Sequence, residues 1–332
     1  MRAGHRSAAL RAPRRWPSTF AGATSPRIGA GGATSATTTV VKLEGTYTAI
    51  VTPFAQSQAI DWPAYERILA DQLAGGVTGI VPCGTTGESP TLSGDEQREV
   101  IARTVATVKG KAQVIAGAGS SSTAHAAELA KQAEKAGADA VMVVVPYYNK
   151  PTQEGLVRHF VSIAKSVAVP IVVYNIPGRS AVDLGLDAMA RILDAAPNVV
   201  ATKEATANVI RAQQLAARFG DRLTILSGDD ALTLPMVAVG GRGVISVASN
   251  VVPGEVSRAT KLALEGDLPR ARAAHLRLVP FYDALFVEPG VASAKALLAR
   301  RGLCENVLRE PMTPLGEAAG KTLFAAYEKL AS

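Results

Sequence analysis

Short apolar runs, rich in Val, Ile and Ala, alternate with longer stretches of helical period from residue 46 onward. Most of these runs are continuous in apolar residues rather than alternating, which is typical of strands buried on both faces, as in a parallel sheet. Eight runs predict strands: residues 46–54, 78–84, 113–119, 140–147, 170–177, 199–205, 223–230 and 243–249.

The segments between the runs predict amphipathic helices, among them residues 61–73, 93–108, 123–136 and 154–166. Asp61, Ser93 and Thr123 open three of them and are predicted N-caps, because their side-chain oxygens can accept free N–H groups of a first turn. Eight strand–helix units predict an α/β fold of the (β/α)8 TIM-barrel type. An open, doubly wound sheet is the alternative, since counting units does not establish closure. The lack of Gly-x-Gly-x-x-Gly after the first strand weakens its dinucleotide-binding version.

The strand signal stops after the eighth unit. Residues 269–286, 291–301 and 316–330 predict helices instead, which form a C-terminal appendage to the barrel. The chain therefore divides into a basic extension at residues 1–43, a catalytic barrel at residues 44–264 and a C-terminal helical region at residues 265–332.

Basic residues are concentrated at the amino terminus. Residues 1–43 hold seven of the 35 lysines and arginines and no acidic residue, so the rest of the chain balances 28 bases against 28 acids. The net charge of +7 therefore comes from this arm, and no nucleic-acid partner is expected. The Arg- and Ser-rich arm reads either as an organelle transit peptide or as an over-long start, with translation beginning near Val41.

Composition narrows the class further. A chain with 48% hydrophobic and 19% charged residues is globular. Its apolar runs reach about seven residues, whereas a membrane span needs about 20, so neither a span nor a membrane partner is expected. Two cysteines, Cys83 and Cys304, exclude a disulfide scaffold and a Cys-rich metal centre and suit a reducing compartment.

Candidate chemistry is sought at the carboxyl ends of the strands, where barrels of this kind carry their active sites. None of the four histidines (His5, His125, His159 and His275) falls there, which argues against a metal-dependent hydrolase, and no metal site is expected. The glycine-rich residues 240–243 precede the last strand, so a tight turn at the opposite end is favoured over a phosphate site.

Lys203 is unusual because it ends the apolar strand at residues 199–202, whereas Lys131 and Lys261 lie in helical segments. Burial lowers the pKa of a lysine, and a free amine can attack a ketone to form a Schiff base. The alternative is an ion pair with Glu204, which is geometrically poor because neighbouring strand residues point to opposite faces. Position alone leaves both interpretations open.

Three of the seven tyrosines, Tyr147, Tyr148 and Tyr174, stand at strand ends. A phenol beside the lysine can pass a proton to and from a carbinolamine, and Thr85 can bridge two phenols. The alternative for each tyrosine is packing with a solvated hydroxyl. Arg179 follows a Pro-Gly turn, where it either grips a substrate carboxylate or is an ordinary exposed arginine.

Five motifs follow one another on these strand ends. The motifs are Gly84-Thr85-Thr86-Gly87-Glu88, Tyr147-Tyr148-Asn149, Tyr174-Asn175-Ile176-Pro177, Lys203-Glu204-Ala205 and Ser227-Gly228-Asp229-Asp230. Together they resemble the pyruvate-dependent class I aldolase/lyase superfamily and, within it, the 4-hydroxy-tetrahydrodipicolinate synthase (dihydrodipicolinate synthase) family, over residues 43–332. In that family the protonated imine is the electron sink, so the resemblance implies no metal and no organic cofactor.

The resemblance also implies residue roles. Lys203 forms the imine with pyruvate, Tyr174 shuttles protons over it, and Thr85 links that phenol to Tyr148 of a neighbouring subunit. The residues implied to bind substrates are Thr86 with its backbone for the pyruvate carboxylate, Arg179 for the carboxylate of the second substrate, and carbonyls near Gly228 and Ile245.

The activity implied is a condensation of pyruvate with L-aspartate 4-semialdehyde to 4-hydroxy-tetrahydrodipicolinate, which opens lysine biosynthesis by the diaminopimelate route. A homotetramer, a dimer of dimers, is implied as well. A related lyase acting on a sugar acid is the alternative, although such enzymes usually differ at the positions of Thr85 and Arg179. A barrel that binds a keto acid without turnover is a third possibility. Such an inactive relative would be expected to lack Lys203 or Tyr174, and this chain has both.

Regulation and location are read from the same resemblance. Lysine-inhibited members commonly carry a histidine where this chain has Gln97 and an acid where it has His125. A lysine ammonium would lose its carboxylate partner here, so weak or absent feedback is expected. Residues 88–91 resemble bacterial members, which favours the cytoplasm, with the plastid stroma as the alternative if the arm is a transit peptide.

Overall fold

The computed structural model describes residues 42–331. The expected basic extension, apart from Lys42 and Leu43, lies outside the described residues. Leu43 is buried and belongs to the apolar cluster inside the barrel.

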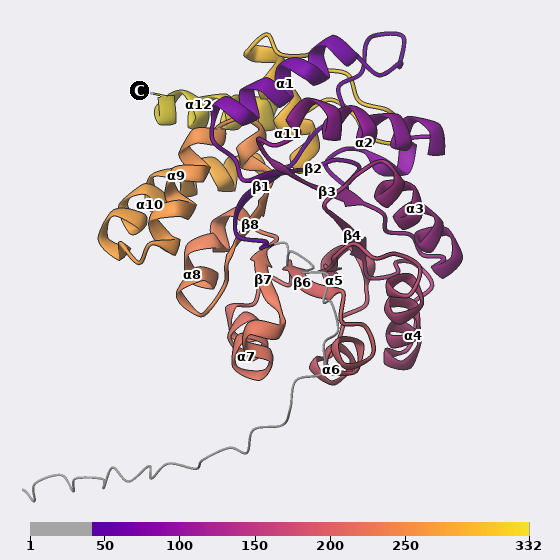
Figure 1. Cartoon of the computed structure of the whole chain (residues 1–332). Helices are drawn as coiled ribbons and strands as arrows, with labels where there is room; N and C mark the ends of the chain where they lie inside the picture. Colours follow the sequence, from indigo (N-terminus) through magenta and orange to yellow (C-terminus); the bar gives the residue numbers. More distant parts are fainter. Residues whose placement is uncertain (1–41, 332) are drawn as a thin grey trace, which may run out of the picture. The chain divides into compact units, whose positions relative to one another are not determined.

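Eight parallel strands close into a barrel in which each strand pairs with the next and β8 pairs with β1 (Figure 1). The predicted (β/α)8 fold is thus confirmed, and the open sheet is wrong. The strands are shorter than the apolar runs, because the last residues of each run leave the sheet and enter loops at its carboxyl end. They are β1 Gly45–Ala49, β2 Gly79–Val81, β3 Gln113–Gly117, β4 Ala140–Val144, β5 Ile171–Asn175, β6 Val199–Glu204, β7 Thr224–Ser227 and β8 Gly243–Ser246.

Helices surround the strands (Figure 1). Those of the barrel are α1 Trp62–Ala74, α2 Gly94–Val108, α3 Thr123–Lys135, α4 Gln153–Ala164, α5 Pro177–Ser180, α6 Leu186–Ala195, α7 Val209–Phe219, α8 Thr233–Ala238 and α9 Pro253–Leu264. The appendage consists of α10 Leu268–Leu285, α11 Gly290–Arg300 and α12 Glu317–Ala331. In it α10 packs against α9 and α12, seen in orange to yellow in Figure 1.

Two of the three predicted N-caps are confirmed. The Asp61 carboxylate accepts a hydrogen bond from the Ala64 N–H at 3.0 Å, and Ser93 forms a reciprocal capping box with Glu96. The third is wrong, because Ser122 caps α3 and Thr123 is its first residue. The Thr123 hydroxyl is instead 2.9 Å from Nδ1 of His159, which lies on the neighbouring helix α4.

Alternation along the strands builds two apolar layers. In β5, Ile171 and Val173 face the helices, whereas Val172 and Tyr174 face the interior of the barrel. The same period of two places Ala201 of β6 inside and carries Lys203 to the interior at the carboxyl end of that strand. The strands thus aim the lysine and the phenol into one space.

Candidate active site

A cavity of about 300 Å³ opens at the carboxyl ends of the strands. It lies between the strand-end loops and the C-terminal region, so both parts of the chain form its wall. Its lining residues are Thr85, Thr86, Glu88, Pro90, Thr91, Tyr174, Ile176, Arg179, Lys203, Gly228, Val247, Phe286, Pro289, Gly290, Val291, Pro311 and Met312.

Lys203 is only 5% exposed, and its Nζ lies 4.2 Å from the centre of the Tyr174 ring. The two residues are paired across β5 and β6, so their side chains leave the sheet side by side. Burial lowers the pKa of Lys203 to about 8. The negative charge of Asp230 opposes this change, and the positive charge of Arg179 reinforces it.

Glu204 does not form an ion pair with Lys203. The strand geometry predicted this separation. Its carboxylate points to the other face of β6, where Oε2 accepts a hydrogen bond from Arg211 Nε at 3.0 Å. Among the residues described, none forms an ion pair or a hydrogen bond with Lys203 Nζ. An amine without such a partner is available to a ligand in the cavity.

Tyr174 is buried, and burial raises the pKa of its phenol to about 12. The positive charge of Arg179 and a side-chain hydrogen bond with Thr85 act in the opposite direction. The phenol therefore stays protonated at neutral pH, beside an amine whose pKa is about 8. Such a pair can donate a proton to an oxygen bound at Lys203 and take one back.

The turn from Gly84 to Glu88 carries the two threonines. The Gly87 and Glu88 N–H groups bond back to the Gly84 and Thr85 carbonyls, at 3.0 and 3.1 Å. No residue in the described range accepts the backbone N–H of Thr85 or Thr86, and both residues line the cavity. Two free N–H groups in a turn suit a carboxylate.

Arg179 lies on the short helix α5, which the Pro-Gly turn opens. The Ser180 hydroxyl fixes this turn by donating to the Ile176 carbonyl at 3.0 Å. The arginine is exposed and lines the cavity, and its side chain has no hydrogen-bond or ion-pair partner within residues 42–331. Its guanidinium is thus free to bind an anion.

The ends of β7 and β8 complete the wall. Gly228 lines the cavity and is packed so closely that an added Cβ would lie 2.5 Å from that of Ala205. The buried Asp230 carboxylate accepts the Ser246 hydroxyl at 2.5 Å and the Val247 N–H at 3.0 Å. Burial raises the pKa of Asp230, which these hydrogen bonds oppose.

Most of the predicted site residues meet in this cavity, and two do not. Tyr148 is 93% exposed on the outside of the chain, and its backbone has a φ of 72°. Ile245 is buried inside the barrel without lining the cavity, which Val247 lines instead. The residues that do line it are Lys203, Tyr174, Thr85, Thr86, Arg179 and Gly228.

Sequence reasoning missed the contribution of the C-terminal region. Phe286, Pro289 and Met312 form the apolar side of the cavity, although they lie far along the chain from the strands. It also missed Lys295, a lysine of α11 that is completely buried. No local pattern marked either feature, because both depend on contacts between distant segments.

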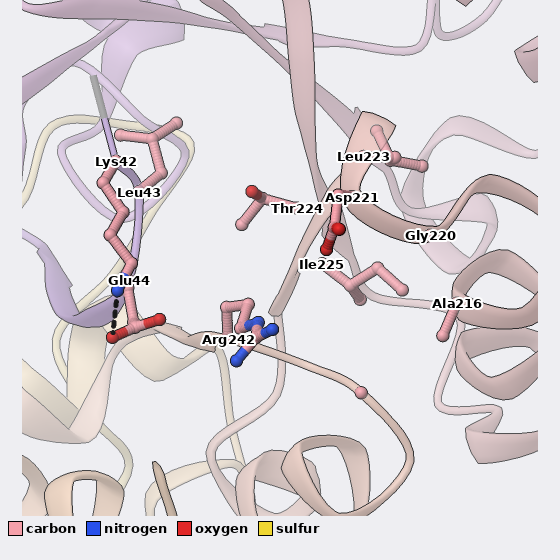
Figure 2. A pocket seen from close by; sticks show the side chains of 11 residues that line it. Lys42, Leu43, Glu44, Ala216, Gly220, Asp221, Leu223, Thr224, Ile225 and Arg242 are labelled. Carbon is pink, nitrogen blue, oxygen red and sulfur yellow. Dashed lines mark hydrogen bonds and ion pairs between the residues drawn. The ribbon is translucent and has the colours of Figure 1, made fainter. Parts of the chain in front are cut away.

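A second cavity, of about 370 Å³, lies at the opposite end of the barrel (Figure 2). It is lined by residues that precede or open β1, β7 and β8, among them Lys42, Glu44, Thr224 and Arg242. Within residues 42–331, no group of three or more His, Cys, Asp or Glu side chains is placed to hold a metal ion. In the same range, no helix combines the length and the apolar character needed to cross a bilayer.

An amine whose pKa is lowered to about 8 supplies the free base that condenses with a ketone, and an adjacent phenol can exchange protons with the adduct. In a closed (β/α)8 barrel, this chemistry defines the class of Schiff-base-forming lyases.

Comparisons with known proteins specify the member of this class. The model of the dihydrodipicolinate synthetase family matches residues 42–330, and the chain belongs to that family and is a lyase. A 4-hydroxy-tetrahydrodipicolinate synthase of Sorangium cellulosum (strain So ce56) is 53% identical over 289 residues, which cover 87% of this chain and 96% of that protein.

Solved structures agree. The 4-hydroxy-tetrahydrodipicolinate synthase of Methylacidiphilum fumariolicum SolV matches with a TM-score of 0.86 at 46% identity, covering 87% of this chain and 96% of that one. The chloride-inhibited dihydrodipicolinate synthase of Acinetobacter baumannii, complexed with pyruvate, matches with a TM-score of 0.86 at 36% identity, covering 87% and 99%.

Proposed function

We propose that this lyase condenses pyruvate with L-aspartate 4-semialdehyde to 4-hydroxy-tetrahydrodipicolinate, the first committed step of lysine biosynthesis by the diaminopimelate route. The observation that carries the proposal is Lys203, a buried amine with no ion-pair partner in the described chain, 4.2 Å from the ring of Tyr174. Family membership and the pyruvate bound in the Acinetobacter baumannii relative support the choice of substrate.

The first half of the reaction takes place on Lys203. Its free amine attacks the ketone carbon of pyruvate, and the Tyr174 phenol protonates the oxygen, which leaves as water. The protonated imine then draws electrons from the methyl carbon, which loses a proton and becomes the nucleophilic carbon of an enamine.

In the second half, the enamine carbon attacks the aldehyde carbon of the semialdehyde. One carbon–carbon bond forms, and the aldehyde oxygen takes a proton and becomes a hydroxyl. The amino group of the semialdehyde then attacks the imine carbon and closes the ring. Lys203 leaves as a free amine, so the enzyme is regenerated.

Two anchors hold the two substrates. The free N–H groups of Thr85 and Thr86, with the Thr86 side chain, bind the pyruvate carboxylate. The Arg179 guanidinium, at the outer side of the same cavity, binds the carboxylate of the semialdehyde. Gly228, which follows β7, and Val247, which follows β8 and takes the place expected for Ile245, line the same cavity.

The proton relay requires a second subunit. Tyr148 is almost fully exposed in the single chain, and it lies outside the cavity that holds Thr85. We place it in the site of a neighbouring copy, where its hydroxyl extends the relay from Tyr174 through Thr85, in a homotetramer built as a dimer of dimers. A Tyr148→Phe variant should keep its oligomeric state and lose roughly 10²-fold in turnover.

The cytoplasm is the location that fits this function. The closely matching relatives are bacterial, and both cysteines in the barrel and appendage are free thiols, as expected in a reducing compartment. Fractionation of the native host tests this, and recovery of the mature chain from another compartment would contradict it.

The direct test is the initial rate of condensation of pyruvate with L-aspartate 4-semialdehyde, coupled to reduction of the product. We expect a rate that saturates with both substrates. Failure of condensation while borohydride still traps pyruvate on Lys203 would show that the acceptor is wrong, and sugar-acid aldehydes would then be assayed in its place.

A further inference from the structure

A buried ion pair joins the threonine-bearing turn to the C-terminal region. Glu88 is the last residue of the turn, and Lys295 lies in the middle of α11. Their side chains are 1% and 0% exposed, and Lys295 Nζ contacts Glu88 Oε1 directly. The pair is thus shielded from water and lies at the wall of the cavity, which Glu88 helps to line.

Both charged groups have further partners in the C-terminal region or beside it. Lys295 Nζ donates to the Val307 carbonyl at 2.9 Å and lies 4.1 Å from the centre of the Phe54 ring. The other carboxylate oxygen of Glu88 accepts the backbone N–H of Arg309 at 3.0 Å. Two separate segments of the C-terminal region therefore hold this one carboxylate.

The turn needs such a hold because its backbone is strained. Cys83, which precedes the turn, and Glu88, which ends it, have φ values of 55° and 54°, in the left-handed region that residues with a Cβ rarely adopt. Backbone of this kind persists when the surrounding structure fixes it. The Glu88 N–H bonds to the Thr85 carbonyl at 3.1 Å, so a shift of Glu88 moves Thr85 as well.

Stability alone does not account for this arrangement. Burying two charges removes both from water, and well-packed apolar residues of similar volume often stabilise a fold as well or better. Asp71 and Arg301 offer a comparison, because they also tie the C-terminal region to the barrel. That pair is bidentate and about a quarter exposed, and neither of its residues lines the cavity.

We propose that the Glu88–Lys295 pair is a positioning device that lets the C-terminal region set the two threonine N–H groups for the keto-acid carboxylate. The inference rests on the proposed function, since it assumes that these N–H groups bind pyruvate. Neither residue touches the reacting atoms. Losing the pair therefore weakens pyruvate binding and leaves the chemistry at Lys203 in place.

The test compares Lys295→Met and Glu88→Gln with the wild type and with Arg301→Met as the matched control. The measurement is the pyruvate concentration that gives half-maximal borohydride trapping on Lys203, together with its pH profile. We expect Lys295→Met to raise that concentration roughly tenfold or more, because a small displacement of a binding group has a large effect. Glu88→Gln, which is nearly isosteric, should raise it less.

The other readouts separate positioning from folding. The pH profile and the maximal trapping should stay as in the wild type, and Lys295→Arg, which keeps the charge, should restore most of the affinity. Arg301→Met should lower the melting temperature with pyruvate affinity unchanged. The double variant Glu88→Gln/Lys295→Met leaves no unpaired charge. Its pyruvate concentration for half-maximal trapping should therefore fall between those of the wild type and Lys295→Met.

Unchanged half-saturation in folded Glu88→Gln and Lys295→Met would overturn the positioning role and leave the proposed function intact. An equal loss of pyruvate affinity in Arg301→Met would overturn it too, because any loosening of the C-terminal region would then suffice. A wild type that traps no pyruvate would instead overturn the proposed function, and the inference with it.

Discussion

The cavity shown in Figure 2, at the amino ends of the strands, and the cavity at their carboxyl ends differ in the state of their lysines. Their volumes are similar, about 370 Å³ and about 300 Å³. At the amino end, Lys42 is 77% exposed and paired with Glu44, as the dashed line in Figure 2 shows. At the carboxyl end, Lys203 is buried and has no such partner in the described chain.

The backbone packs differently at the two ends of the barrel. At the amino end β1 and β8 approach so closely that a Cβ on Gly243 would lie 2.0 Å from the Gly45 carbonyl oxygen. This close pairing of β1 with β8 leaves no room for a side chain at Gly243. At the carboxyl end the strands run into loops, and buried polar side chains such as Lys203 and Tyr174 line the cavity there. Burial of a titratable group, rather than cavity size, therefore identifies the site.

The largest effect on kcat should come from replacing the carboxyl-end lysine by alanine, and the amino-end lysine provides the control. Lys203→Ala removes the nucleophile and should lower kcat on the order of 10⁴-fold or more. Lys42→Ala removes an exposed lysine at the other cavity and should leave kcat unchanged. Steady-state condensation rates check both variants, with thermal melting as the control for folding. Retained turnover in Lys203→Ala would rule out this lysine as the nucleophile.

The next largest effect is expected on the KM for the semialdehyde, where Arg179 at the carboxyl end is compared with Arg242 at the amino end. Arg179→Ala should raise the KM for the semialdehyde roughly 10- to 100-fold, because a charge-assisted pair with its carboxylate is lost, and should change pyruvate half-saturation much less. Arg242→Ala, at the opposite cavity, should change neither constant. If Arg242→Ala produced the same KM increase, the assignment of the two ends would be wrong.

The pKa of Lys203 predicts a smaller, graded effect of pH. Imine formation needs the free amine, so at low pyruvate its rate should level off above pH 8 and fall about tenfold per pH unit below it. Arg179→Ala removes a positive charge that lowers this pKa, so its profile should move to higher pH. Rapid-mixing measurements of imine formation across pH give both profiles. A rate independent of pH from 6 to 9 would contradict this.

Lysine feedback is the smallest expected effect. Gln97 and His125 line a cavity of about 250 Å³ beside the site, and Gln97 donates its amide hydrogens to the Ser89 and Leu92 carbonyls. An ammonium ion finds no carboxylate at either position. Millimolar lysine should therefore barely change the rate, whereas Gln97→His/His125→Glu should gain inhibition. Strong inhibition of the unaltered enzyme would show that other groups bind lysine.

Sequence predicted the barrel because its strands are marked locally, by apolar runs and by the helices between them. The burial of Lys203 followed from the same pattern, and so did the separation of Lys203 from Glu204. The sequence-based predictions were wrong where neighbouring residues were equally suited to one structural role. Ser122 and Thr123 are both good caps, and the bend after β8 brings Val247 rather than Ile245 to the cavity.

The contribution of the C-terminal region to the cavity could not be predicted from local sequence patterns. Phe286 and Met312 reach the site only because α10 and α11 fold back over the barrel, and their spacing carries no periodic signal. Lys295 lies in a helix and reads as a solvated lysine until its contact with Glu88 is known. Contacts across some 200 residues are what the sequence could not reveal.

The most direct test of the account is to map where pyruvate attaches. The enzyme is incubated with pyruvate, reduced with borohydride, digested, and searched by mass spectrometry for the reduced adduct. We expect the adduct on Lys203 alone, with none on Lys42 or Lys295. An adduct on another lysine, or no adduct under conditions that support condensation, would contradict it.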